Sequence, residues 1–139
     1  MNAADWPADA TRLLVLRLSP GDDLRTGLEA AFADSRARSG FVVACVGSLS
    51  AAALRYAGRG EASVTEAPLE VVSLSGTFSA DGCHLHAGLS DADGRMIGGH
   101  VLPGCTVRTT AEVVLGLTDA VAFNRPLDPE TGYAELSVK

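Results

Sequence analysis

The chain has 139 residues, of which 47% are hydrophobic, and its 11 basic and 17 acidic side chains give a formal net charge of −6. This length fits one domain with a buried core, so we expect a single domain over residues 11–139 after a flexible tail over residues 1–10. The charge has the wrong sign for a protein that must neutralise phosphates by itself, which disfavours direct nucleic-acid binding.

The cysteine pattern and the lack of long apolar runs indicate the cellular compartment. Cys45, Cys83 and Cys105 are odd in number and show no Cys-x-x-Cys spacing. This usage favours buried, reduced thiols in a cytoplasmic protein over a disulfide framework. The first nine residues carry no apolar run, and no stretch approaches 18 apolar residues. We therefore expect neither an export signal nor a membrane anchor.

The first 40 residues predict one strand and one helix. Trp6 is the aromatic side chain of the tail and is expected to dock onto the domain or onto a neighbouring subunit. Residues 12–18 read as a strand, and turn and capping residues follow over 19–23. Apolar side chains then recur at helical spacing up to Ser39-Gly40, at Leu24, Leu28, Ala31 and Phe32. This pattern predicts an amphipathic helix of about four turns.

The remainder is rich in β-branched residues and glycine. Short runs bounded by Gly, Pro and Asp predict strands over 41–46, 51–56, 62–66, 69–78, 83–89, 95–102, 107–117, 120–124 and 134–138. A strand, a helix and then many strands predict an α+β domain. We expect a mostly antiparallel sheet with one main helix.

All three histidines of the chain fall in this β-rich part, as His84-Leu85-His86 and Gly98-Gly99-His100. Residues two apart in a strand point the same way, so His84 and His86 share a face, and His100 can join them across a tight turn. Three imidazoles can hold Zn²⁺ or a similar divalent ion and leave one coordination position open.

The register of the turn decides whether this site forms. In one register, the numbers of two residues paired across the hairpin sum to 186, and His86 then faces His100. In another register they sum to 184, and His84 then faces His100. An odd sum puts His100 on the opposite face unless a bulge at Gly98-Gly99 restores it. The alternative interpretation is a polar sheet face, or a subunit contact, lined with neutral imidazoles.

Several polar residues lie near the histidines in the sequence or could approach them in the fold. Cys83 should point away from the face of His84, and Asp91, Asp93 and Gly94 are typical of a turn. Glu112 lies on the polar face of its strand, where it could orient a ligand histidine or act as a general base. Its alternative role is a salt bridge to Arg108 or to a neighbouring subunit.

Other chemistry has weak support. No Ser-His-Asp arrangement, phosphate-cradling loop or dinucleotide fingerprint is present. Arg55, Arg59 and Arg95 are scattered among acidic residues. Gly58-Arg59-Gly60 stops short of the Arg-Gly-Arg-Pro core that reads AT-rich minor grooves.

Taken together, the motifs of the chain resemble the plants-and-prokaryotes-conserved (PPC) domain family, in its stand-alone prokaryotic form. The resemblance extends from about Arg12 to the C-terminus. The matching pieces are Leu16-Arg17-Leu18, Pro20–Leu24, Gly47–Ser50 with Leu54-Arg55, Pro68–Phe78, His84-Leu85-His86, Leu89–Asp91, Gly94, Gly98-Gly99-His100, Gly104, Val107, Thr109–Glu112 and Asp128–Tyr133.

The resemblance implies an α+β fold that assembles as a homotrimer and binds a metal, with His84, His86 and His100 as ligands and zinc as the expected ion. The family also carries the label of DNA-binding protein, because plant members join this domain to AT-hooks. This chain has no AT-hook. The plant partner-binding segment Gly-Arg-Phe-Glu-Ile-Leu aligns with residues 67–72, where Glu70 is the one identity.

Three hypotheses follow. The first is a cytoplasmic, trimeric metal-binding protein whose function is binding or an undefined metal-dependent chemistry, with binding preferred. A reaction at this site would be metal-dependent, would act on a small polar substrate and would use Glu112 as proton acceptor. The second is a DNA-binding or transcription-associated module, and the third is a structural trimer without chemistry.

Overall fold

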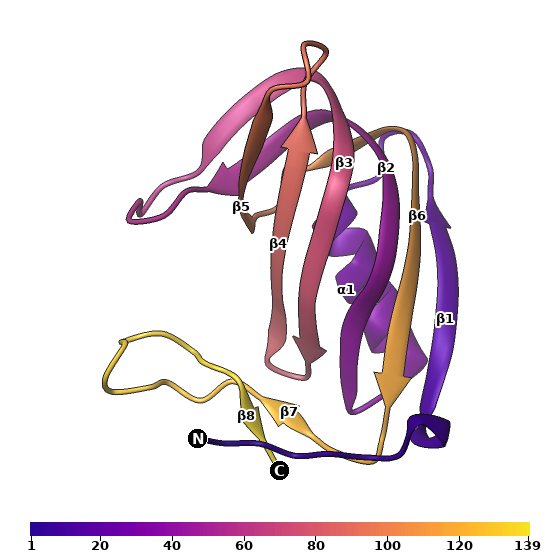
Figure 1. Cartoon of the computed structure of the whole chain (residues 1–139), viewed down its shortest axis with the longest axis vertical. Coiled ribbons are helices and arrows are strands. Elements are labelled where there is room, and N and C mark those ends of the chain that lie inside the picture. The colour runs from indigo at the N-terminus through magenta and orange to yellow at the C-terminus, as the bar shows by residue number, and fades with distance from the viewer.

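A computed structural model describes residues 1–139. A six-stranded antiparallel sheet in the order β1-β6-β2-β3-β4-β5 carries one α-helix behind it (Figure 1). The elements are β1 (Thr11–Leu18), α1 (Leu24–Ser35), β2 (Ser39–Arg55), β3 (Ser63–Ser79), β4 (Gly82–Ser90), β5 (Met96–Val101) and β6 (Thr106–Thr118). A short 3₁₀ turn (Ala8–Ala10) precedes them, and β7 (Phe123–Asn124) pairs with β8 (Ser137–Val138) in a second sheet. The predicted α+β fold is confirmed.

The long strand β2 closes one end of the sheet on itself. It pairs with β6 and β3 along its length, and its last residues, Leu54 and Arg55, pair with Val101 and His100 of β5. β2 also pairs with β3, β3 with β4, and β4 with β5. These four strands therefore form a closed ring of pairings. This closure brings Arg55 beside His100.

The helix covers one face of the sheet and leaves the other bare. Leu24, Leu28 and Phe32 face inward at successive turns, and the ring of Phe32 stacks on Phe78 at 5.5 Å between centroids. Asp23 caps the start of the helix, since its Oδ1 accepts a hydrogen bond from the backbone N–H of Thr26 at 2.9 Å. The core therefore lies between α1 and the sheet.

The helix and two strands depart from the sequence-based expectations. The helix ends at Ser35, earlier than expected, because Arg36 adopts the left-handed conformation with φ 57°. The segments 41–46 and 51–56 form one strand, β2, and 62–66 and 69–78 form one strand, β3. A Cβ at Gly47 would collide with the carbonyl oxygen of Thr110 on β6. The glycine therefore permits close strand approach and does not mark a turn.

Both ends of the chain contact the domain. The indole N–H of Trp6 donates to Oγ1 of Thr11 at 2.9 Å, and its ring lies 6.4 Å from Phe41 and 6.1 Å from Phe123, between centroids. The expected strands over 120–124 and 134–138 shrink to the two-residue strands β7 and β8.

With 12 residues, α1 does not have the length of a membrane-crossing helix.

Candidate metal centre

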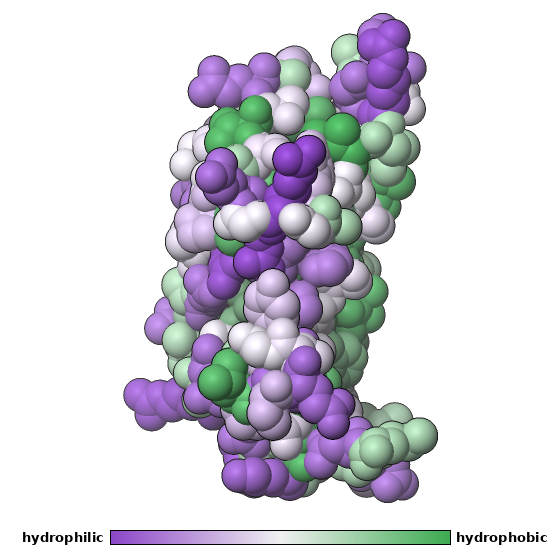
Figure 2. All heavy atoms as spheres, turned by 90° about the vertical axis from the view of Figure 1, so that its left-hand side faces the viewer, coloured by the Kyte–Doolittle hydropathy of each residue, from purple (hydrophilic) through white to green (hydrophobic).

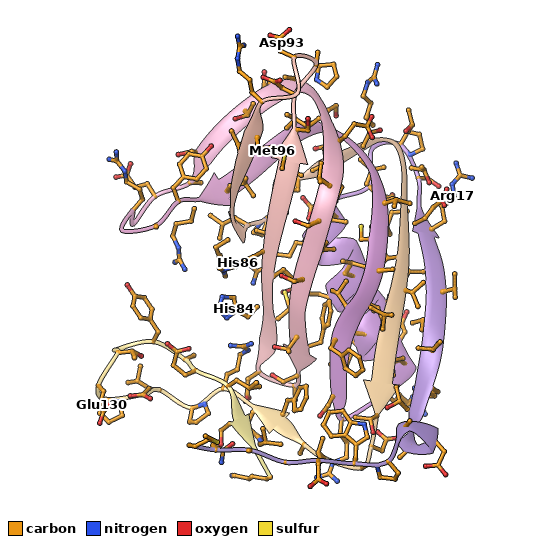
Figure 3. The ribbon with its side chains drawn as sticks, viewed as in Figure 1. Arg17, His84, His86, Asp93, Met96 and Glu130 are labelled. Carbon is orange, nitrogen blue, oxygen red and sulfur yellow. The ribbon has the colours of Figure 1, made fainter.

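His84, His86 and His100 converge on one face of the sheet. His86 and His100 are register partners, so the pairing sum of 186 holds without a bulge. One ring nitrogen from each histidine lies within 4.8 Å of the others, and the Nε2 atoms of His84 and His86 are 3.1 Å apart. Figure 3 shows His84 and His86 on the left of β4, between the β2–β3 hairpin and the C-terminal loop that carries Glu130.

These three rings fit a divalent metal ion. Zinc–nitrogen bonds of about 2.0–2.1 Å in a tetrahedron put ligand nitrogens about 3.3 Å apart, close to the separation of His84 and His86. The Nδ1 atom of His100 is buried and has no hydrogen-bond partner in the protein. Three nitrogen donors without a carboxylate or thiolate suit zinc and its neighbours in the transition series, and three protein ligands leave a fourth position open.

Strand alternation and close backbone packing position the rings. Cys83 and Leu85 point into the core, so the histidines between and after them point out. A Cβ at Gly76 of β3 would collide with the carbonyl oxygen of His84, and a Cβ at Gly99 would lie 2.7 Å from the carbonyl oxygen of Arg55. Glycine at these positions lets β3 and β2 approach the histidine strands closely.

The sequence-based view of Cys83 and the turn residues is confirmed. Cys83 is buried, and its Sγ donates a hydrogen bond to Oε1 of Glu29 at 3.0 Å, away from the rings. Asp91 closes the β4–β5 turn, because its Oδ1 accepts from the backbone N–H groups of Asp93 and Arg95 at 2.9 and 2.8 Å. All three cysteines are free.

Glu112 lies outside the histidine cluster of its own chain. It is an exposed residue of β6, and its register partners are Arg17 on β1 and Val46 on β2. Figure 3 places Arg17 at the edge of the sheet opposite the histidines. The structure contains only two salt bridges, and neither joins Glu112 to Arg108.

Two arginines adjoin the histidines, and neither was recognised as a site residue from the sequence. Nη1 of Arg125 lies 3.4 Å from Nδ1 of His84, and its Nη2 donates to Oγ1 of Thr77 at 2.7 Å. Arg55 is the register partner of His100. No local motif predicts these contacts, because Arg125 follows the last long strand and Arg55 reaches β5 only through the closure of the sheet.

Burial and these arginines favour the neutral form of His84 and of His100. Burial first, and then the charge of Arg125, lowers the pKa of His84. Burial first, and then the charge of Arg55, lowers the pKa of His100 from 6.5 to about 4. Neutral imidazole is the form that binds a metal, so the lowered pKa values of His84 and His100 favour metal binding by these two rings.

Three cavities adjoin the rings. The larger, about 710 Å³, is lined by His86, His100, Arg55 and Arg59, together with serines, tyrosines and glycines. The smaller, about 340 Å³, is lined by His84, His100 and Arg55, and also by Asp81, Glu135 and Arg125. A third, about 250 Å³, includes His84, His86 and Arg125 in its lining. The histidine cluster therefore borders open space in more than one direction.

Comparisons with known proteins identify relatives over nearly the whole chain. The family model described as the Plants and Prokaryotes Conserved (PCC) domain matches residues 7–119. A curated relative, the "Bifunctional protein GlmU" of Synechococcus sp. (strain JA-3-3Ab), is 44% identical over 133 residues. The match covers 96% of this chain and 21% of that protein, so the chain spans about one fifth of the relative's length.

Solved structures repeat the fold. A hypothetical protein from Salmonella cholerae-suis superposes with a TM-score of 0.92 and 40% identity, covering 100% of this chain and 98% of that one. AF0104 from Archaeoglobus fulgidus, called a metal-containing protein, has a TM-score of 0.75 and 27% identity, covering 90% and 92%. A "Putative DNA-binding protein" from Ralstonia eutropha JMP134 shares the fold, with a TM-score of 0.69, 23% identity, and coverage of 90% and 89%.

Proposed function

The chain belongs to the Plants and Prokaryotes Conserved domain family, and from this we propose that it is a homotrimeric, cytoplasmic protein that binds one zinc ion through His84, His86 and His100. The observation that carries the proposal is the convergence of the three ring nitrogens within 4.8 Å. The buried Nδ1 atom of His100 has no hydrogen-bond partner within the protein, and a buried polar atom of this kind is costly unless a ligand satisfies it. The relative from Archaeoglobus fulgidus that is called metal-containing supports this assignment.

An exposed apolar face supports self-association. Leu13 and Val15 of β1, Val46 of β2 and Val72 of β3 are 64%, 73%, 59% and 59% exposed. Hydrophobic residues gather along the right-hand edge of Figure 2, the front of the molecule in Figure 1, where no helix covers the sheet. Exposed apolar side chains on a sheet face without a covering helix are typical of a protein interface. We assign it to further copies of this chain, as the family resemblance implies.

In a trimer, Glu112 would lie at a contact between subunits. It shares the bare face with Arg17 and Val46, so trimerisation would bring it to a subunit contact. There it serves the contact itself, or it reaches a neighbouring metal site as a proton acceptor. We favour a binding role over an enzymatic one, because Glu112, the expected proton acceptor, lies outside the histidine cluster of its own chain.

Nucleic-acid binding is the second candidate, and the description of the Ralstonia eutropha neighbour favours it. The net charge of −6 opposes it, and three copies triple that charge. A band-shift titration against salt separates the two functions. Phosphate contacts would give binding that weakens as salt rises, whereas we expect no binding even at low ionic strength.

Zinc content and mass test the first proposal. The full chain is loaded with zinc and dialysed, then analysed by mass spectrometry for metal and by light scattering for mass. We expect about one zinc per chain in a particle of about three chains. His84→Ala should lose zinc, and Ser75→Ala, an exposed neighbour on β3, should keep it. Zinc content unchanged in His84→Ala would contradict the metal site, and a monomer would contradict the trimer.

A further inference from the structure

The larger cavity beside the histidines carries unpaired positive charge. Arg55 and Arg59 line it, and neither side chain takes part in a hydrogen bond or in one of the two salt bridges, Arg25–Glu29 and Arg95–Asp93. No aspartate or glutamate is among its lining residues. In a chain with a net charge of −6, the sign of this cavity is opposite to that of the molecule.

We propose that this cavity binds a small anionic ligand, a molecule with a phosphate or carboxylate group, whose oxygens pair with Arg55 and Arg59 beside the metal ion. The inference deepens the metal-binding function proposed above and rests on it, because the cavity shares His86 and His100 with the metal site. It assigns the class of ligand that the site takes.

Charge compensation is the first argument. Arg55 is half-buried, and its positively charged guanidinium loses hydration without gaining a protein partner. A divalent ion on three neutral imidazoles adds two more positive charges. An oxyanion offsets the charge of Arg55 and the charge of the metal ion. The planar guanidinium group also matches the geometry of phosphate and carboxylate oxygens.

The size and the remaining lining favour a small molecule. A volume of about 710 Å³ lies within the range of ordinary ligand pockets. Ser73 and Ser75 offer hydroxyl groups from β3, and Tyr56 and Tyr133 offer ring surface for the body of a ligand. Figure 2 views the molecule from this side and shows mostly hydrophilic residues around its centre.

The acidic side chains of the region lie on the other side of the cluster. Asp81 and Glu135 line the smaller cavity next to His84. Oδ2 of Asp81 accepts a hydrogen bond from the backbone N–H of Arg125 at 2.8 Å, and Oε1 of Glu135 accepts one from Thr131 at 3.1 Å. Arg55 and Arg125 also line this smaller cavity, but Asp81 and Glu135 offset their charge there. An anion is therefore directed to the larger cavity, which holds Arg55 and Arg59 and no acidic residue.

Calorimetric titration of the full chain tests this inference, with inorganic phosphate and succinate as separate probes. We expect at least one probe to bind the zinc-loaded protein, and Arg55→Gln to weaken that binding by about tenfold or more. The matched control is Arg95→Gln, which removes the same charge from an exposed arginine in the β4–β5 turn and should change binding by less than about twofold.

Zinc content is measured on the same samples, which separates the two proposals. Arg55→Gln with full zinc and weak anion binding supports the inference. Failure of both probes to bind zinc-loaded protein, or equal binding by Arg55→Gln and Arg95→Gln, overturns it. A wild-type chain that holds no zinc would contradict the metal site but not the anion site. The effect of Arg55→Gln on anion binding is then measured in the metal-free chain. If Arg55→Gln does not fold, Arg59→Gln in the exposed hairpin replaces it.

Discussion

His86 on β4 and His100 on β5 are direct cross-strand partners, so their imidazoles leave the sheet on the same face. His84 precedes His86 by two residues and joins them from that face. The metal site therefore depends on the register of a single hairpin. A slip by one residue would turn His100 away from the other two rings.

The packing of Gly99 offers a test of this dependence. In Gly99→Ala the new Cβ would lie 2.7 Å from the carbonyl oxygen of Arg55, which forces β5 away from β2. We expect zinc affinity to fall about tenfold and the free energy of unfolding to fall by about 1–3 kcal/mol. Chelator competition and urea denaturation measure the two quantities. Gly60→Ala, where nothing lies within 4 Å of the added Cβ, is the control and should change neither.

The fold and the histidine face could be predicted from local patterns. Alternation along 107–117 predicts the inward row of β6, where Val107, Ala111 and Val113 are buried. The helical spacing of Leu24, Leu28 and Phe32 predicts the buried face of α1 in the same way. The His-x-His spacing alone puts two rings on one side of a strand.

The surroundings of the site could not be predicted, because they depend on long-range geometry. Gly47 is typical of a turn, yet its missing side chain allows β2 to continue past β6. Only the full length of β2 carries Arg55 to His100 on β5. Arg125 reaches His84 from the segment after β7, and no spacing in the sequence encodes that contact.

The pKa of His100 gives a pH dependence with a definite sign. Its pKa in the folded protein is lowered to about 4, against 6.5 for an ordinary histidine. The unfolded chain therefore takes up this proton first as pH falls. The stability contribution of neutral His100 is present above pH 6.5 and is lost as pH falls from 6.5 toward 4.

Ring-proton NMR of the metal-free protein measures this pKa. We expect a titration midpoint for His100 near pH 4, and a higher midpoint in Arg55→Gln, because the charge of Arg55 contributes to the lowering. A midpoint near 6.5 in the wild-type protein would show that neither burial nor Arg55 acts on this ring.

Arg125 is expected to weaken metal binding. Its Nη1 atom lies 3.4 Å from Nδ1 of His84, so its positive charge opposes a cation at the cluster and lowers the pKa of that ring. In Arg125→Gln we expect zinc affinity at pH 7.5 to rise by roughly three- to tenfold. Competition with a chromophoric chelator measures the change. Weaker zinc binding would mean that the contacts of Arg125 with Thr77 and His84 position the ligand instead.

The apolar face predicts the effect of a charge on assembly. Val15 is 73% exposed on the bare side of β1, and a carboxylate there would have to be buried in a trimer. We expect Val15→Glu to dissociate the trimer in light scattering, while Leu127→Glu, also at a position 73% exposed but off the sheet, leaves it intact. An intact trimer in Val15→Glu would place the interface elsewhere.

The central claim is that three histidines of one hairpin hold a metal ion. Anomalous scattering at the zinc edge, from crystals of the zinc-loaded full chain, tests it most directly. We predict one peak per chain, about 2.0–2.1 Å from a ring nitrogen of each of His84, His86 and His100. A zinc-loaded crystal with no peak at these rings, or with its peak at other residues, would contradict the claim.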